Sequence, residues 1–257
     1  MENRVVQPIF YNRFYYGLSG LVLPIPKYKF PPEHQDSSRL TYYATFFNSI
    51  EINSSFYKIP LPATIAKWTG LVPADFKFTF KLFRDITHNK GLEFKSEDIA
   101  RFFKAIAPAA NKNGCVLIQL PPGTGKECML PLQALLNCVK ANNPHGAWKI
   151  AVEFRNRSWY VPDVYNLLGD TRAAMVIQDI PRSAAPMLHQ TGDFVYARFH
   201  GPTGNYRDTY PESFLYEYSG YIREWLDEGR QVYTYFNNTI GDAYNNQQTL
   251  ARFVLSA

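Results

Sequence analysis

The chain has 257 residues, of which 46% are hydrophobic and 19% are charged. This composition excludes a disordered chain and supplies enough apolar side chains for one sizeable core or two small ones. Lysine and arginine exceed aspartate and glutamate by 27 to 22, a net charge of +5 that suits an anionic ligand but is far below that of a protein that coats nucleic acid.

Short apolar segments alternate with helical patterns along the chain. Strands are predicted at residues 15–20, 49–53, 76–81, 115–120, 149–155, 175–179, 195–200 and 232–237. Helical spacing of apolar residues follows at Leu40, Tyr43, Ala44 and Phe47, at Ile99, Phe102, Phe103 and Ile106, and at Leu132, Leu135, Leu136 and Val139. Further helices are predicted within 164–168, 215–226 and 250–254, the last behind Asp242 as its cap.

Eight strands, helical connections and this length predict an α/β fold, a TIM-like (β/α)8 barrel formed by one domain over residues 1–257. The link between the sixth and seventh strands is barely long enough for a crossover, so a shortened or missing helix is one expectation there. An open doubly wound sheet is the alternative. Its usual glycine-rich phosphate loop is not matched by residues 17–20, which read Gly-Leu-Ser-Gly.

The three cysteines, Cys115, Cys128 and Cys138, have neither zinc-site nor redox-motif spacing. They favour a reduced compartment, and we expect a cytoplasmic protein. The first residues contain no continuous apolar segment of the kind that a secretory signal needs. No segment approaches the roughly 20 apolar residues of a membrane span, so no membrane association is expected.

Polar residues fall on one side of the predicted strands. In the second strand Glu51 and Asn53 alternate with Ile50 and Ile52, and strands three, five and seven repeat this pattern. The polar side becomes charged toward the carboxyl end of each strand. In a barrel these ends meet at one face, where the fold builds its active sites, so we predict a functional site at this face.

The candidate catalytic residues are Glu51, Glu153, Asp179 and His200, with Glu153 or Glu51 as the base and His200 as the acid. The candidate substrate-binding residues are Asn53, Lys81, His88, Gln119, Arg155, Trp159, Arg198, Tyr206, Asn237 and Asn238. The planar guanidinium groups of the arginines suit carboxylate or phosphate. Arg198 in particular is expected to bind an anion, so its replacement by alanine should change the stability of the protein little.

These residues favour an enzyme acting by acid–base chemistry on a small polar anion, such as a phosphate- or carboxylate-bearing sugar or nucleotide. The reaction would be of hydrolase, lyase or isomerase type. No metal and no cofactor are expected. Two arginines and a lysine lie at the same carboxyl-end face of the barrel, here called the mouth, and their positive charges oppose the binding of a metal cation. Two alternatives stay open: a non-catalytic binder of single-stranded nucleic acid or nucleotides, which is less favoured, and a structural ion network.

Several segments resemble the DUF72, or YecE-like, family. They are GLSG at 17–20, SIEINSSFYKIP at 49–60, KFTFKLFRDITH at 77–88, LIQLPP at 117–122, AVEFRNRSW at 151–159, the step at 179–181, ARFHG at 197–201 and YFNN at 235–238. The resemblance implies a TIM-like barrel and names no substrate. Leu18 and Leu21 replace the Thr and Trp of the family's usual GTSGW, so contacts made by those two side chains in relatives are not expected here.

Overall fold

The computed structural model describes residues 12–187 and 191–256. Its strands are β1 (Phe14–Leu18), β2 (Ser49–Ile52), β3 (Lys77–Lys81), β4 (Asn113–Gln119), β5 (Lys149–Glu153), β6 (Ala173–Met175), β7 (Ile177–Gln178), β8 (Phe194–Phe199) and β9 (Gln231–Phe236). All paired strands are parallel and form two sheets, ordered β1-β9-β8-β7 and β2-β3-β4-β5-β6. The predicted sixth strand is divided at Val176, so the chain passes there from one sheet into the other.

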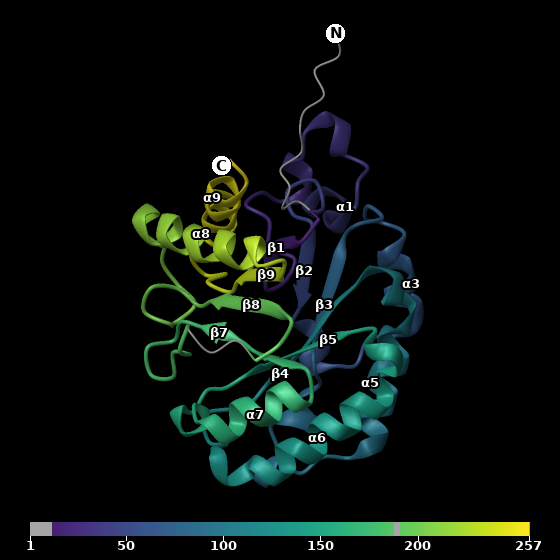
Figure 1. Ribbon diagram of the computed structural model, residues 1–257. Coiled ribbons are helices and arrows are strands. Elements are labelled where there is room, and N and C mark those ends of the chain that lie inside the picture. Colours follow the sequence, from purple (N-terminus) through teal and green to yellow (C-terminus); the bar gives the residue numbers. More distant parts are fainter. Residues whose placement is uncertain (1–11, 188–190, 257) are drawn as a thin grey trace.

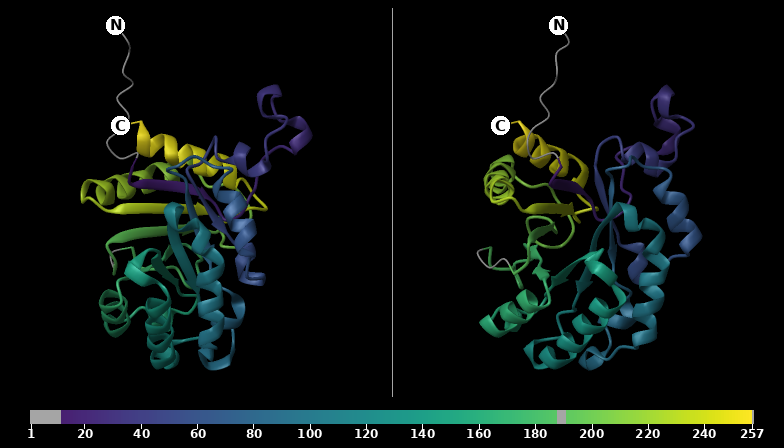
Figure 2. Two further views of the ribbon diagram at one scale, coloured as in Figure 1. Left: turned by 90° about the vertical axis from the view of Figure 1, so that its right-hand side faces the viewer. Right: turned by 45° about the vertical axis from the view of Figure 1, so that its right-hand side comes forward.

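Helices connect the strands and surround them (Figure 1). The connecting helices are α1 (Arg39–Tyr43), α3 (Pro62–Thr69), α5 (Ser96–Ile106), α6 (Met129–Asn142), α7 (Pro162–Asp170) and α8 (Glu212–Asp227), and α9 (Ala243–Leu255) follows the last strand. Single turns, α2 (Ser54–Tyr57) and α4 (Arg84–Thr87), follow β2 and β3. The connection between β1 and α1 extends away from the rest of the chain (Figure 2). In the described ranges, no helix has both the length and the apolar character needed to cross a bilayer.

The two sheets also meet where β1 lies beside β2. A single parallel bridge joins Ser19 to Glu51 there, in place of a continuous ladder. The Tyr43 hydroxyl adds a side-chain link, because it accepts a hydrogen bond from Leu18 N at 2.7 Å and donates to Ser49 O at 2.9 Å. The strands therefore form the predicted TIM-like arrangement, with a seam between β1 and β2 held in part by a tyrosine.

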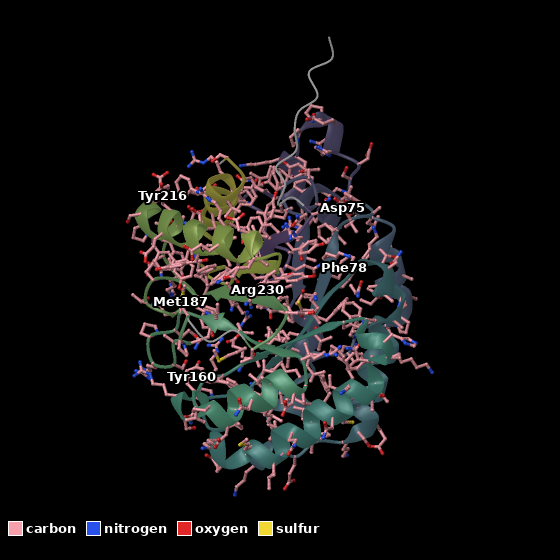
Figure 3. The ribbon with its side chains drawn as sticks, viewed as in Figure 1. Asp75, Phe78, Tyr160, Met187, Tyr216 and Arg230 are labelled. Carbon is pink, nitrogen blue, oxygen red and sulfur yellow. The ribbon has the colours of Figure 1, made fainter. Side chains whose placement is uncertain are left out.

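The connection from β7 to β8 has no helix in its described part, residues 179–187 and 191–193, which agrees with the expected missing helix. Hydrogen bonds hold this segment instead. The hydroxyl of Tyr160, labelled in Figure 3, donates to Ser183 O at 2.6 Å. The Gln178 carbonyl accepts from Ala185 N at 2.9 Å. The segment is thus fixed to β7 and to the residues that follow β5.

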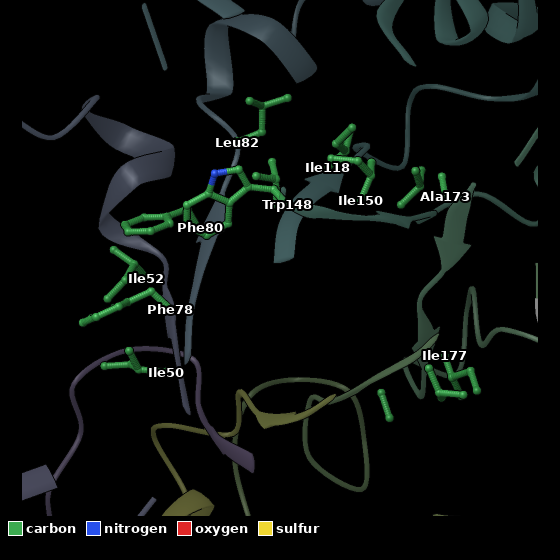
Figure 4. Packing of buried hydrophobic residues seen from close by; sticks show 14 of the residues in the cluster. Ile50, Ile52, Phe78, Phe80, Leu82, Ile118, Trp148, Ile150, Ala173 and Ile177 are labelled. Carbon is green, nitrogen blue, oxygen red and sulfur yellow. The ribbon is translucent and has the colours of Figure 1, made fainter. Parts of the chain in front are cut away.

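Apolar residues form two clusters on the two sides of the strands. The larger cluster joins strands to helices, and it includes Ile50, Ile52, Phe78 and Phe80 along β2 and β3 (Figure 4). The smaller cluster contains Tyr15, Cys115, Leu117, Ala151, Ala174, Val176, Phe194, Tyr196, Tyr233 and Tyr235. Its members alternate with those of the larger cluster along the strands, so they fill the barrel interior.

Candidate functional site

The charged residues predicted for one face do converge inside the carboxyl end of the barrel. Glu51 on β2, Glu153 on β5, and Arg198 and His200 on and after β8 form one hydrogen-bonded cluster. Each is at most 1% exposed. Because side chains alternate along a strand, each occupies the interior side of its own strand, above the apolar interior cluster.

Arg198 lies at the centre of the cluster. Its Nη2 donates to Glu51 Oε1 at 2.8 Å, and its Nη1 donates to Glu153 Oε2 at 2.9 Å. Its Nε lies 3.1 Å and 3.2 Å from the two oxygens of Glu51. The guanidinium is therefore occupied by two carboxylates and closed to solvent. The expectation that Arg198 binds a ligand anion directly is not met by this geometry.

Glu51 is fully supplied with donors. Besides Arg198, it accepts hydrogen bonds from Ser19 Oγ at 2.6 Å and from the Tyr196 hydroxyl. Burial alone would raise the pKa of Glu51, but the charge of Arg198 and these hydrogen bonds hold the pKa below its ordinary value. Glu51 is therefore an ionised anchor for Arg198.

Arg155 forms the outer part of the cluster. Its Nε donates to Glu153, its Nη2 lies 2.9 Å from His200 Nε2, and its Nη1 lies 3.4 Å from the Tyr206 hydroxyl. Burial opposes ionisation of Glu153, yet the charges of Arg155 and Arg198 hold the pKa of that carboxyl well below its ordinary value. Glu153 is therefore shared between the two arginines.

The hydrogen bonds of His200 define its tautomer. Nδ1 lies 3.1 Å from Asp179 Oδ1, whereas Nε2 faces Arg155 Nη2 at 2.9 Å and Arg198 Nη1 at 3.3 Å. Arginine can only donate, so Nε2 is the acceptor and Nδ1 carries the proton. Burial lowers the pKa of His200, and the hydrogen bond to Asp179 only partly offsets this. The imidazole is therefore neutral, and Asp179 orients it.

Lys81 ends β3 on the interior side and is partly buried. Its ammonium lies 4.1 Å from the centroid of the Phe56 ring, and across residues 12–187 and 191–256 it has no hydrogen bond or close ion pair. Burial, followed by the charge of Arg198, lowers the pKa of Lys81 from 10.5 to about 8, against the opposing effect of Glu153 and Glu51. Lys81 is thus the cation of the mouth without a close anionic partner in the described chain.

His88 lies on the same aromatic ring as Lys81. The His88 and Phe56 rings are 4.8 Å apart, and His88 Nδ1 is 2.8 Å from Thr87 Oγ1. Burial, followed by the positive charge of Lys81, lowers the pKa of His88 to about 4. The imidazole is therefore neutral at physiological pH. The Phe56 ring thus contacts both the His88 ring and the Lys81 ammonium.

Other predicted binding residues divide into two groups. Asn53 and Tyr206 reach the cluster, with Asn53 Oδ1 3.4 Å from Arg198 Nη2, and Asn237 is partly exposed after β9. Trp159 and Asn238 are closed to solvent.

The members of the second group have other partners. The Trp159 indole donates to Thr124 O at 2.7 Å, and the Asn238 amide donates to Asp208 O at 2.9 Å. Gln119 is nearly buried and donates to the carbonyl of the next residue at 2.9 Å. These bonds fix loops and strand ends in place, so contact of Trp159 or Asn238 with a ligand would require these side chains to move.

Sequence reasoning missed Ser19 and Tyr196 as members of the site. Tyr196 precedes Arg198 by two residues, so the period of two that found Arg198 also places Tyr196 on the interior side. Tyr210 has a related role, since its hydroxyl donates to Asp179 and accepts from Gly201 N at 2.6 Å. Tyrosine hydroxyls thus support two carboxylates of the cluster.

Metal ligation has little geometric support. Within the part of the chain that the structure describes, no group of three or more His, Cys, Asp or Glu side chains is arranged to hold a metal ion. The cluster's buried carboxylates instead face arginine donors.

Parallel strands, helical connections and a charged cluster at the carboxyl ends define a TIM-like α/β barrel protein. The family model described as "Protein of unknown function DUF72" matches residues 16–256. The chain belongs to the DUF72 family, as the resemblance of its motifs predicted.

Known proteins support both the family and the fold. UPF0759 protein YunF of Bacillus subtilis strain 168 is 29% identical over 248 residues, which cover 84% of this chain and 86% of that protein. A crystal structure of a DUF72 family protein from Enterococcus faecalis V583 has a TM-score of 0.77 and 23% identity, covering 94% of this chain and 95% of that chain. An AP endonuclease, family 2, from Brucella melitensis has a TM-score of 0.53 at 11% identity, covering 88% of this chain and 92% of that chain. The two structural likenesses concern the fold alone.

Proposed function

We propose that the carboxyl end of the barrel binds a small anionic molecule and performs acid–base chemistry on it. Lys81 is the observation that carries this proposal, because it ends β3 beside the charged cluster and its ammonium has no close carboxylate in the described chain. The carboxylates of Glu51, Glu153 and Asp179, by contrast, all accept hydrogen bonds from protein donors. The free capacity of the site is therefore that of a donor, which favours an anion.

Arg155 is the second proposed contact for the anion. Its side chain is 9% exposed, whereas that of Arg198 is 1% exposed. Its bond to Tyr206 is long, at 3.4 Å, so a carboxylate or phosphate oxygen can compete for Nη1. Tyr206 supplies a neutral polar group beside Arg155, and Asn53 supplies one beside Arg198. Arg198 acts indirectly in this account, by fixing Glu153 and through it Arg155.

His200 is the proposed acid–base group. Its Nε2 carries a lone pair directed toward Arg155, and Asp179 holds the opposite nitrogen. His200 can take a proton at Nε2 once Arg155 turns from the imidazole to the bound anion, which reverses the acid role expected from the sequence. Glu51 and Glu153 stay ionised in this proposal and position the arginines, in place of the base role expected for them.

We also propose a cytoplasmic location. It rests on Cys115, Cys128 and Cys138, which are all free thiols in the structure. Burial raises the pKa of Cys115, so this thiol is poorly suited to act as a nucleophile.

Thermal melts with inorganic phosphate test the binding proposal, with Lys81→Met as the variant. Lys77→Met is the matched control, since Lys77 lies on the same strand and the same side but at its amino end. We expect phosphate to raise the melting temperature of the parent and of Lys77→Met, and to have little effect on Lys81→Met.

Two results would contradict the proposal: a parent indifferent to phosphate, or equal responses of the two variants. Oligonucleotides provide a further comparison. Affinity that grows with oligonucleotide length and falls steeply with salt would favour the nucleic-acid alternative instead.

A further inference from the structure

Lys81 differs from the barrel lysines that form ion pairs. Lys126 pairs with Asp163 at 3.2 Å, and Lys149 pairs with Asp193 at 3.5 Å. Among the residues that the structure describes, Lys81 has no close ion pair, and its ammonium lies over the Phe56 ring. Its nitrogen is therefore not committed to a structural ion pair.

The groups around Lys81 make its neutral amine more accessible than that of an ordinary lysine. Partial burial and the positive charges of Arg198 and Arg155 act against the ammonium, Glu153 and Glu51 act in its favour, and the resulting pKa is about 8. The face of Phe56 holds the flexible side chain in place beside His88. A partly deprotonated lysine amine beside an aromatic ring and two arginines, at the carboxyl end of a barrel strand, has the properties of a nucleophile.

We propose that Lys81 forms an imine with a small carbonyl compound whose carboxylate or phosphate group is bound by Arg155. This inference rests on the proposed function and narrows its substrate class to anionic aldehydes, ketones or 2-oxo acids. Arg155 suits the anionic part, because its guanidinium fork binds planar oxyanions in pairs of hydrogen bonds. Lys81 then acts on the carbonyl carbon of the same molecule.

The chemistry requires no oxidant or reductant. The lone pair of Lys81 Nζ forms a bond to the carbonyl carbon, and one N–H proton is transferred to the resulting alkoxide. The hydroxyl then takes a proton from solvent and leaves as water, while the nitrogen lone pair forms the C=N bond. The nitrogen keeps its second proton, so this step gives the protonated imine directly. The protonated imine withdraws electrons from the adjacent carbon, so a C–H proton there becomes acidic enough for His200 to accept once Arg155 has turned to the anion.

Reductive trapping tests this inference on the intact protein. Borohydride delivers hydride to the imine carbon and leaves a stable secondary amine, which mass spectrometry of peptides locates. The probes are pyruvate and dihydroxyacetone phosphate, with acetone as the uncharged comparison. We expect an anionic probe to modify Lys81 at least tenfold faster than it modifies Lys77, and at least tenfold faster than acetone modifies Lys81. The rate of labelling at Lys81 should rise through about pH 8.

Two variants separate this inference from the proposed function. Lys81→Arg keeps a cation but cannot form an imine, so it should keep the phosphate-induced rise in melting temperature and lose the tenfold labelling at this position. Lys81→Met should lose both. Circular dichroism spectra matching that of the parent establish that each variant is folded.

Labelling that is equal at Lys77 and Lys81, absent with both anionic probes, or insensitive to charge would overturn the imine inference. Such results leave anion binding intact if phosphate still stabilises the parent and Lys81→Arg. A parent indifferent to phosphate would instead contradict the proposed function itself.

Discussion

The two ends of the barrel interior are built from the same strands but from different side chains. The amino end is filled by an apolar and aromatic layer that includes Tyr15, Cys115, Phe194 and Tyr233. The carboxyl end contains Glu51, Glu153, Arg198 and His200. Burying charge costs several kcal/mol per ion unless its partners are well placed, so apolar residues suffice where only packing is needed. The carboxyl end therefore holds buried, mutually paired charges where the amino end is packed with apolar and aromatic side chains.

The lysines at the two ends of strand β3 show the same difference between the amino and carboxyl ends of the barrel. Lys77 lies 5.9 Å from the Tyr15 ring, and Lys81 lies 4.1 Å from the Phe56 ring. Burial lowers the pKa of both lysines, and carboxylates partly offset this: Asp75 for Lys77, and Glu153 with Glu51 for Lys81. A cavity of about 540 Å³ opens at the amino ends of neighbouring strands, beside Lys149. The amino end therefore offers space and lysines, and it is the natural control for each variant at the carboxyl end.

The largest expected effect is on folding. Arg198→Ala leaves Glu51 and Glu153 buried without their shared cation, and we expect the free energy of unfolding to fall by about 3 to 5 kcal/mol. Urea denaturation of parent and variant measures this. A loss below about 1 kcal/mol would restore the sequence-based interpretation of Arg198 as a direct anion ligand.

A smaller loss is expected for the tyrosine that supports Glu51. Tyr196→Phe removes a donor from a buried carboxylate and should cost about 1.5 to 3 kcal/mol in the free energy of unfolding. Tyr233→Phe is its matched control in the interior aromatic layer, where the hydroxyl has a long bond of 3.5 Å to Gln231. An equal loss of unfolding free energy in the two variants would show that the tyrosine hydroxyl contributes no more beside the buried carboxylate than in the apolar layer.

The third effect depends on pH. Lys81 has a lowered pKa of about 8 in the folded chain, against an ordinary value of 10.5, so the folded state releases its proton first as pH rises. The penalty for the buried charge is present below pH 8 and disappears by about pH 10.5. The stability of the parent relative to Lys81→Met should therefore rise across this window, by on the order of 1 to 2 kcal/mol after allowing for solvent screening.

Urea denaturation of both proteins at several pH values between 7 and 10.5 gives this difference, in which the titration of other groups cancels. A flat difference would mean that Lys81 titrates as an ordinary surface lysine.

The smallest effect is predicted at the amino end. Lys149 and Asp193 form an ion pair at 3.5 Å with side chains that are 26% and 79% exposed. Lys149→Ala should therefore change the free energy of unfolding by no more than about 1 kcal/mol. A loss as large as that of Arg198→Ala, measured in the same denaturation series, would remove the contrast between the two ends.

The sequence predicted most of the fold because its strands are strongly patterned. Alternation within β2 and β3 placed Glu51 and Lys81 on the interior side, and the structure has both there. Helix α3 was missed because only Ile65 of its residues is buried, which leaves no apolar period to detect. The break at Val176 was also missed, since it depends on a change of sheet and not on a local signal.

The site was predictable in location but not in its internal connections. A period of two in the sequence predicts that charged residues share one side of a strand. It does not predict that Arg198 pairs with Glu51, because the two residues are far apart in the chain. The tautomer of His200 likewise depends on arginines from two strands, and the burial of Trp159 depends on a loop carbonyl. Burial and hydrogen-bond partners are properties of the assembled barrel.

NMR titration of the lysine side chains measures the pKa of Lys81 itself, with its signal assigned through its loss in Lys81→Met. We expect Lys81 to titrate near pH 8 without phosphate and at higher pH with phosphate, while the pKa of Lys77 is unchanged by phosphate. Titration of Lys81 near 10.5 under both conditions would contradict the claim that the carboxyl end holds an unpaired cation ready to bind an anion.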